Sequence, residues 1–283
     1  MSFDLSAVGA SSQSQPIAWS SKDCLLYALG LGAGPDDLAY TTENSHGITQ
    51  QALPTMPVIL GVDFSVLSNL GTIDWTRLVH AEQGIELFRP FSVEGRATAT
   101  TRLTDVWDKG KAAVIVTETT AVDDASQKPI FTTRSAVFIK GAGGFGGPRG
   151  PERPPAQELD KPTASVTYPT TPSQPLLYRL SGDRNPLHSD PWFARKAGFD
   201  RPILHGLCTY GMTGRALIST VADGDPAQLR SMHARFASPV MPGDTLHVEI
   251  WRDSPTEVRF RTHLDDGTVV LSDGYASLTA GGA

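Results

Sequence analysis

The sequence predicts an α+β fold made of two similar halves, in which helical segments precede antiparallel strands. Three observations support this prediction. A segment rich in glycine and proline divides the chain, short motifs recur in the same order on either side of it, and alternating apolar residues follow the helical segments. The composition fits a folded chain, since 40% of the 283 residues are hydrophobic and 19% are charged.

The dividing segment is the most irregular part of the chain. Ten of the fifteen residues 141–155 are Gly or Pro, a composition that sustains neither a helix nor a sheet ladder. We therefore expect an N-terminal repeat over residues 1–140, a linker over 141–165 and a C-terminal repeat over 166–283. The run 141–146 also matches the G-x-G-x-x-G nucleotide motif, but prolines follow it where that motif needs a helix, so we discard a nucleotide site.

Three short matches relate the two halves. The run LLYAL at 25–29 returns as LLYRL at 176–180, and the pair Val106-Trp107 returns as Ile250-Trp251, at offsets of 151 and 144 residues. A looser match joins RPFSVEG at 89–95 to SPVMPG at 238–243. Each match is weak, but their common order indicates a duplicated unit.

The individual elements follow from local patterns. Residues 20–23 form a capping box before the apolar run 24–29, which predicts the start of a helix. The mostly apolar run 206–219 predicts a second, buried helix. Strands are predicted where apolar residues alternate or form short runs, with a hairpin turn at 265–267, namely at 102–106, 112–116, 135–139, 246–250, 258–264 and 269–271.

Charge and composition exclude several classes of protein. A net charge of −6 and a pI near 5.6 exclude a dedicated binder of nucleic acid or of anionic membranes. No apolar run approaches the ~18 residues of a membrane span, and the N-terminus lacks the pattern of a secretory signal. Cys24 and Cys208 are expected to be buried free thiols in a reducing compartment.

The segment 178–191 (YRLSGDRNPLHSDP) carries the candidate chemistry. Asp183, Asn185 and His188 lie within six residues of one another, in a bend rich in Gly and Pro. At the 151-residue offset, glycines occupy most of the equivalent window, 30–34. Because only one copy carries this acid, amide and imidazole, we expect the reactive centre in the second half.

An acid and an imidazole suit the addition or elimination of water. One group takes a proton from water while the other gives or carries a proton, and Asn185 would fix the geometry. A structural alternative stays open, in which Asp183 caps a turn, Asn185 bonds its own backbone and His188 is a satisfied interior histidine. Function is favoured by Gly206, whose backbone N–H would stand at a helix N-terminus and could bind a developing oxyanion.

Other chemistries have less support. Ser181, Asp183 and His188 are residue types of a catalytic triad, but three members so close in sequence rarely reach triad geometry, and no G-x-S-x-G elbow is present. Metal binding by Asp183, His188 and His205 lacks a helical His pair or a Cys cluster. We therefore expect neither a metal nor a cofactor.

The segment 178–188, with Ala194 six residues on and ILHGLC at 203–208, resembles the hydratase 2 motif of the MaoC-like dehydratase family. The resemblance extends into the first half and covers the chain after residue 15. It implies a double hot-dog fold, in which each repeat is a curved antiparallel sheet wrapped around a helix. It further implies a catalytic C-terminal repeat, and an N-terminal repeat whose shortened central helix makes room for a long acyl chain.

The resemblance implies reversible hydration of a trans-2-enoyl-CoA to the (3R)-3-hydroxyacyl-CoA, the reaction of a hydro-lyase. Asp183 and His188 would hold the water, Asn185 would orient it, and the Gly206 N–H would bind the thioester oxygen. Further substrate contacts would come from the rest of the bend and from both repeats, namely from Arg184, Pro186, Leu187, His80, Ala81, Lys109 and Phe236.

Among these positions, Lys109 has an expected charge role and Ala81 departs from the family pattern. Lys109 would pair with the phosphates of CoA. The family has Gly where this chain has Ala81, a departure that bears on the shape of the site around His80 and not on the reaction.

Two other functions remain open: an acyl-CoA thioesterase on the same fold, and a non-catalytic subunit that binds acyl thioesters. An acyl-CoA is the expected partner, and a homodimer is expected by analogy. The lack of a secretory signal and of an S-K-L ending leads us to expect a cytoplasmic location.

Overall fold

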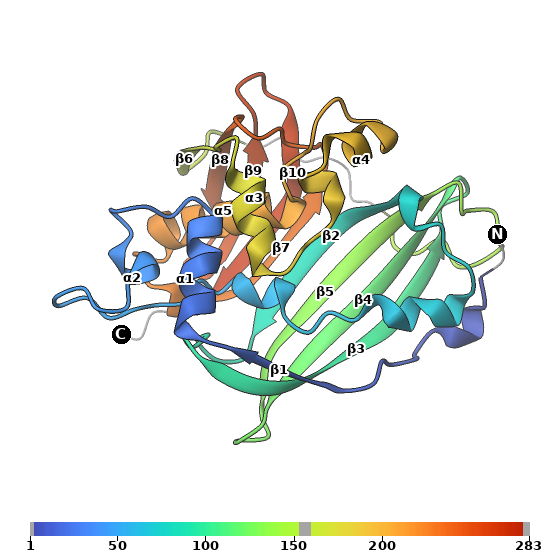
Figure 1. Ribbon diagram of the computed structural model, residues 1–283, viewed down its shortest axis with the longest axis horizontal. Helices are drawn as coiled ribbons and strands as arrows, with labels where there is room; N and C mark the ends of the chain where they lie inside the picture. The colour runs from blue at the N-terminus through green and yellow to red at the C-terminus, as the bar shows by residue number, and fades with distance from the viewer. Residues whose placement is uncertain (1–2, 153–159, 280–283) are drawn as a thin grey trace.

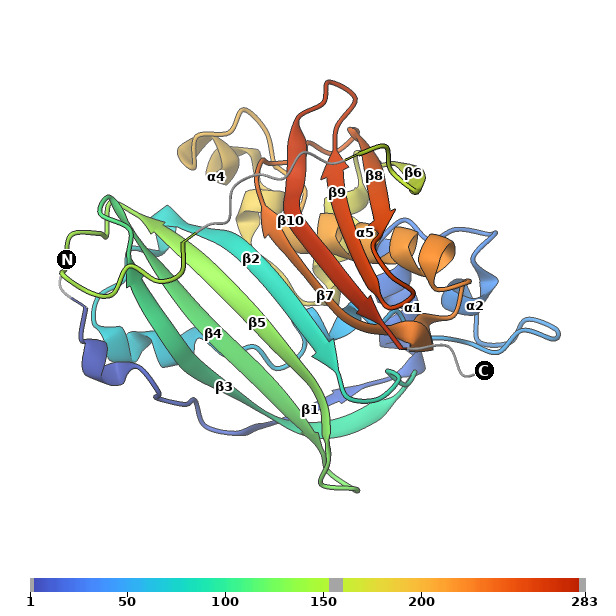
Figure 2. The same cartoon turned by 180° about the vertical axis from the view of Figure 1, so that it is seen from behind.

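The computed structural model describes residues 3–152 and 160–279 and is built on one ten-stranded antiparallel sheet (Figures 1 and 2). The N-terminal strands are β1 (Gln15–Trp19), β2 (Leu78–Leu87), β3 (Gly95–Asp108), β4 (Ala112–Asp123) and β5 (Pro129–Lys140). The C-terminal strands are β6 (Ala164–Pro169), β7 (Leu229–Phe236), β8 (Thr245–Arg252), β9 (Glu257–His263) and β10 (Val269–Leu278).

The order of the strands repeats from one half to the other. Read from its two edges inward, the sheet runs β1-β3-β4-β5-β2 on one side and β6-β8-β9-β10-β7 on the other, and β2 and β7 join in the middle. Each strand of the first half thus has a counterpart five positions later in sequence order. The predicted duplication and the α+β double hot-dog fold are confirmed. Every predicted strand falls on an observed one, although the strand predicted at 258–264 ends one residue earlier, at His263.

Helices cover one face of this sheet. They are α1 (Ser21–Gly30), α2 (Leu38–Thr41), α3 (Gln174–Tyr178), α4 (Pro191–Lys196) and α5 (Gly206–Val221). The predicted capping box is present, since the Ser20 N–H donates to the Asp23 carboxylate at 2.9 Å. The related runs LLYAL and LLYRL lie in α1 and at the end of α3, and these helices contact each other.

The main hydrophobic core lies between α5 and the C-terminal strands. Apolar side chains of α5 pack on the inward-facing residues of β8 and β9, among them Val248 and Phe260. The 3₁₀ helices Met56–Ile59 and Phe64–Leu70 cover the N-terminal strands instead of a long helix. Cys24 and Cys208 are both free and buried, as predicted.

The expected linker belongs in part to the N-terminal repeat. Ala142 is buried, and the Asp108 carboxylate at the end of β3 accepts the N–H groups of Gly144 and Gly146, each at 2.8 Å. Strand β6 begins at Ala164, inside the range expected for the linker, and residues 153–159 lie outside the described residues. Within the described ranges, no helix is long and apolar enough to cross a membrane.

Candidate active site

The bend between α3 and α4 is held by its own polar side chains. The Asp183 carboxylate accepts the Asn185 N–H at 3.0 Å, and the Asn185 side-chain oxygen accepts the Leu187 N–H at 3.0 Å. The second bond caps the 3₁₀ helix Pro186–His188. Asp183 and Asn185 therefore do stabilise the turn, as the structural alternative predicted. These two bonds use one carboxylate oxygen of Asp183 and the side-chain oxygen of Asn185, and they do not use the other carboxylate oxygen or the Asn185 amide N–H groups.

His188 is buried and turned toward Asp183. Its Nδ1–H donates to the Ile203 carbonyl at 2.9 Å, which leaves Nε2 for other partners. An Asp183 carboxylate oxygen and a ring nitrogen of His188 lie within 4.8 Å of each other. Two hydrogen bonds of ~2.8 Å to one water span roughly 4.5 Å at a tetrahedral angle, so this spacing fits a single water held by both groups.

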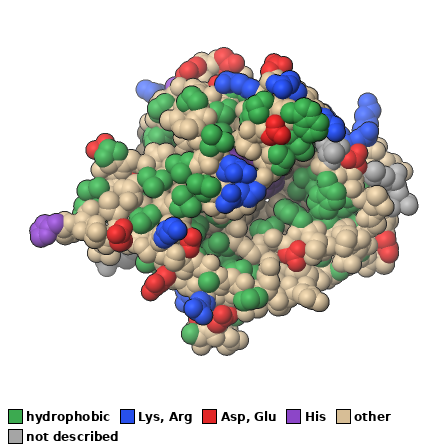
Figure 3. Space-filling model, in the orientation of Figure 1, with side chains coloured by type: hydrophobic (Ala, Val, Ile, Leu, Met, Phe, Trp, Pro, Cys, Tyr) green, Lys and Arg blue, Asp and Glu red, His purple; other side chains and the backbone are tan. Residues whose placement is uncertain are grey.

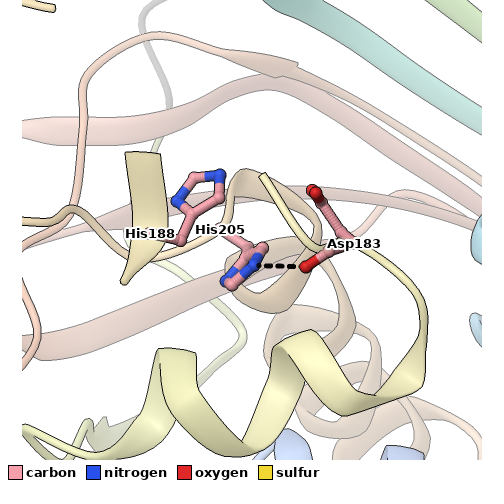
Figure 4. Close-up of side chains that lie close together, drawn as sticks. All are labelled: Asp183, His188 and His205. Carbon is pink, nitrogen blue, oxygen red and sulfur yellow. Dashed lines mark hydrogen bonds between the residues drawn. The ribbon is translucent and has the colours of Figure 1, made fainter. Parts of the chain in front are cut away.

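A second histidine completes the cluster. His205 lies beside both Asp183 and His188 (Figure 4), and one of its ring nitrogens falls within the same 4.8 Å. From the sequence, His205 was named only as a possible metal ligand. Its place directly before Gly206 was the sequence feature that could have indicated a role at the site. Each of the three residues offers one ligand atom, so the cluster could hold a metal ion.

Burial keeps the histidines of this region neutral. It lowers the pKa of His188 below the usual 6.5, against the opposing effects of its bond to Ile203 and the charge of Asp183. Burial, and then the neighbouring His188, lower the pKa of His205 to about 3. Burial likewise lowers the pKa of His80 to about 4. At neutral pH these rings are therefore uncharged, and for His188 the uncharged ring is the form that a general base requires.

The start of α5 provides a donor beside the bend. Helix α5 begins at Gly206, and among the described residues no acceptor is found for the Gly206 N–H. A Cβ atom at this position would lie 3.0 Å from the Phe236 ring, so any larger residue would press on the ring and require it to move by a few tenths of an ångström. A free N–H at the positive end of a 16-residue helix suits an anionic oxygen.

The pairing of β2 with β7 brings residues of the two repeats together. The ring of His80, on β2, lies 4.8 Å from the ring of Phe236, on β7, and His80 Nε2 hydrogen-bonds Ser135 at 2.9 Å. Ala81 is the extra residue of a β-bulge, where the register with β5 shifts between His80 and Glu82. Its φ is not positive, so the backbone at this position does not require glycine.

Of the other expected contacts, three lie in the bend itself and one lies on a distant strand end. Arg184 and Pro186 are exposed and Leu187 is half-buried. Lys109 follows the end of β3, which is three strands from β2; its Nζ donates to the Pro151 carbonyl at 3.3 Å. Figure 3 shows a hollow on the face that carries α3 and α4, bordered by hydrophobic and basic side chains. The roles of these residues toward a substrate stay predictions.

Comparison with known proteins agrees with this geometry. The family "MaoC like domain" matches residues 154–273, and the family "MFE-2 hydratase 2 N-terminal domain" matches residues 18–141. The chain is 46% identical to 3-hydroxyacyl-thioester dehydratase Y of Mycobacterium tuberculosis, over 99% of this chain and 100% of the relative. It is 42% identical to enoyl-CoA hydratase ChsH3 of the same organism, over 89% and 91% of the two chains.

Solved structures show the same relationship. A MaoC-like dehydratase from Phytophthora capsici superposes with a TM-score of 0.86 at 30% identity, covering 96% of each chain. Full-length peroxisomal multifunctional enzyme type 2 from Drosophila melanogaster gives 0.79 at 36% identity, over 94% of this chain and 48% of that one. With both family matches and relatives of this similarity along its whole length, the chain belongs to the MaoC-like dehydratase family, in the branch that carries the hydratase 2 N-terminal domain.

Proposed function

We propose that this protein is a hydro-lyase that hydrates trans-2-enoyl-CoA reversibly to (3R)-3-hydroxyacyl-CoA. The observation that carries the proposal is the Asp183–His188 pair, whose ligand atoms lie within 4.8 Å of each other and of His205, the residue directly before Gly206 at the start of α5. The names of the relatives, enoyl-CoA hydratase and 3-hydroxyacyl-thioester dehydratase, describe the two directions of such a reaction.

The residues present supply each part of the chemistry. Asp183 and His188 together take a proton from the bound water as its oxygen bonds to C3 of the enoyl group. The electron pair of the double bond moves to the thioester oxygen, where the Gly206 N–H and the positive end of α5 stabilise the negative charge. The proton then passes to C2 and the carbonyl reforms, so one water is consumed and no oxidant is needed.

The substrate would enter between the two repeats. His80, Ala81 and Phe236 would line the path at the β2–β7 junction, together with the bend that adds Arg184, Asn185, Pro186 and Leu187. Lys109 would meet the CoA phosphates farther along the sheet. This leaves the N-terminal repeat, 1–140, for the acyl chain and the C-terminal repeat, 166–283, for the reaction, with the linker 141–165 between them.

Space for an acyl chain is supported by the helices of the first repeat. At the 151-residue offset, α5 corresponds to residues 55–70, where two short 3₁₀ helices replace one long helix. The buried face of the strands below them carries small polar side chains, among them Thr117, Thr133 and Ser135. These 3₁₀ helices are narrower than an α-helix, so they leave more room for an acyl chain between themselves and the strands.

The test is an assay on the purified protein with crotonyl-CoA and a longer enoyl-CoA. We expect loss of the enoyl absorbance, and a product oxidised by a (3R)-specific and not by a (3S)-specific 3-hydroxyacyl-CoA dehydrogenase. A chelator should leave the rate unchanged, since the proposed steps use no metal. Release of free CoA, measured with a thiol reagent, would instead show a thioesterase, and binding without turnover would show a non-catalytic subunit.

Two further properties belong to the proposal. We expect a homodimer, because hot-dog sheets present edge strands that can pair, here β1 and β6. Light scattering should then give about twice the chain mass of 30.3 kDa. The two free thiols suit a reducing compartment such as the cytoplasm. Some relatives are named as peroxisomal, so the location of a tagged protein in cells is the deciding measurement.

A further inference from the structure

His205 lies where the catalytic bend meets helix α5. It is the N-cap residue of α5 and directly precedes Gly206, and its side chain is only 1% exposed. The proposed reaction assigns no step to this residue. Its contacts nevertheless reach both groups that would hold the reacting water.

The first contact is with the backbone of the bend. His205 Nε2–H donates to the Asp183 carbonyl at 3.2 Å. A carbonyl can only accept, so Nε2 carries the proton of the neutral ring, and Nδ1, which is buried, has no partner among the described residues. This bond ties the bend to the first turn of α5, and so fixes Asp183 relative to the Gly206 N–H.

The second contact is with the ring of His188. The two imidazoles are stacked, with centroids 3.8 Å apart and planes 27° apart. Because His188 also donates to the Ile203 carbonyl at 2.9 Å, the short segment 203–205 holds that ring both by its edge and by its face. The fully buried Tyr178 ring packs against His205 at 4.9 Å and restricts its movement.

We propose that His205 is a positioning residue for hydration, which holds Asp183 and His188 at the spacing of one water by a hydrogen bond to the first and a ring stack on the second. This inference rests on the proposed function. Reacting groups tolerate little displacement, since a shift of about 1 Å can cost on the order of 100-fold in rate. Loss of either contact should therefore lower kcat and leave KM nearly unchanged, because His205 is buried behind the pair.

Three substitutions separate the two contacts. A glutamine amide can reach the place of Nε2 and keep the donor, whereas an asparagine amide reaches only the place of Nδ1. Phenylalanine keeps the stacked ring without a donor. We expect kcat of His205→Asn and His205→Phe to fall on the order of 10- to 100-fold. The kcat of His205→Gln should lie well above that of His205→Asn, because glutamine keeps the donor. The KM of all three variants should stay within about threefold of the wild-type value.

The control is His46→Asn, which makes the same change at an exposed histidine. Unfolding midpoints of all variants are measured beside the kinetics. The inference is overturned if His205→Asn keeps the wild-type kcat, if Gln and Asn lose kcat equally, or if the losses follow the unfolding midpoints. A wild-type protein without hydratase activity would instead overturn the proposed function, so the two failures are distinct.

Discussion

The two repeats share a sheet and differ in what covers it. In the C-terminal repeat, α5 is a continuous helix of 16 residues. In the equivalent residues 55–70, Pro57 stands in the first turn, where a helix tolerates proline, but Gly61 has a φ of +70°, and a Cβ there would lie 2.5 Å from the Ala99 Cβ. The left-handed backbone at Gly61 interrupts the helix. Duplication therefore preserved the strand pairing, while a few local substitutions changed the helix.

The equivalent bends differ in the same way. In the second repeat, the bend places Asp183 and His188 with their ligand atoms within 4.8 Å of each other, the spacing that the proposed reaction uses to hold one water. In the first repeat, the residue at the position of His188 is Asp37, whose carboxylate pairs with Arg215 of α5 at 2.8 Å. Arg215 also donates to the Leu31 carbonyl at 2.7 Å. One copy of the bend thus carries the candidate chemistry, and the other holds the long helix in place.

The largest expected effect comes from the bend of the second repeat, which carries Asp183 and His188. Asp183→Asn and His188→Gln should each lower kcat by roughly 10²–10⁴, the usual contribution of a general acid or base. Asp36→Asn, a matched change at an exposed carboxylate of the first copy, should leave kcat within twofold of wild type. Steady-state hydration of crotonyl-CoA measures all three. Equal rates for wild type and Asp183→Asn would refute the division of roles between the copies.

The pH profile sharpens the assignment to His188. Its pKa is lowered by burial, and the proposed reaction needs the neutral ring, so kcat/KM should fall at low pH. The fall should approach tenfold per pH unit, and its midpoint should lie below the usual pKa of 6.5. The assay uses crotonyl-pantetheine, which lacks the CoA phosphate, because that phosphate has a pKa of about 6 and its titration would overlap with the profile. A midpoint above the usual value would contradict a buried neutral His188.

Chain-length selectivity tests the role of the N-terminal repeat. Thr133 lies on the buried face of β5, opposite Ile85 of β2 and Thr119 of β4. Thr133→Leu should lower kcat/KM for a ten-carbon enoyl-CoA about tenfold, since one added or missing methylene in a pocket is worth about 1–3 kcal/mol. Crotonyl-CoA should be nearly unaffected. Thr132→Leu, at the neighbouring position with the opposite orientation, is the control, and an equal loss for both substrates would contradict the assignment.

The smallest effect on catalysis is expected from the bend of the first repeat, whose Asp37 pairs with Arg215 of α5. Asp37→Asn removes one partner of a pair whose Arg215 side chain is only 8% exposed. Because the Asp37 side chain is 34% exposed, we expect a cost of about 2 kcal/mol in the free energy of unfolding, less than for a fully buried pair. Urea unfolding measures it. A large loss of kcat in the folded variant would show that the two bends are coupled in catalysis.

Much of this molecule could be predicted from local patterns. Alternating residues predicted the strands, the capping box Ser20–Asp23 predicted the start of α1, and the apolar run from Gly206 predicted α5. The polar bend 183–188 could be chosen as the candidate site because its copy in the first repeat lacks those groups. These features depend on residues close in sequence, whose spacing alone determines which face they share.

Other features required the tertiary structure. His80 and Phe236 meet only because β2 pairs with β7, and His205 contacts Asp183 only because α5 packs beneath the bend. The packing of Ala142 also places part of the expected linker in the first repeat. Such contacts join residues far apart in the chain, and sheet order and core packing decide them, so no local pattern encodes them. The sequence by itself determined the elements and the reactive groups. The packing of α5 against the bend decided how those groups meet, and the pairing of the two repeats decided which residues of the first half lie near them.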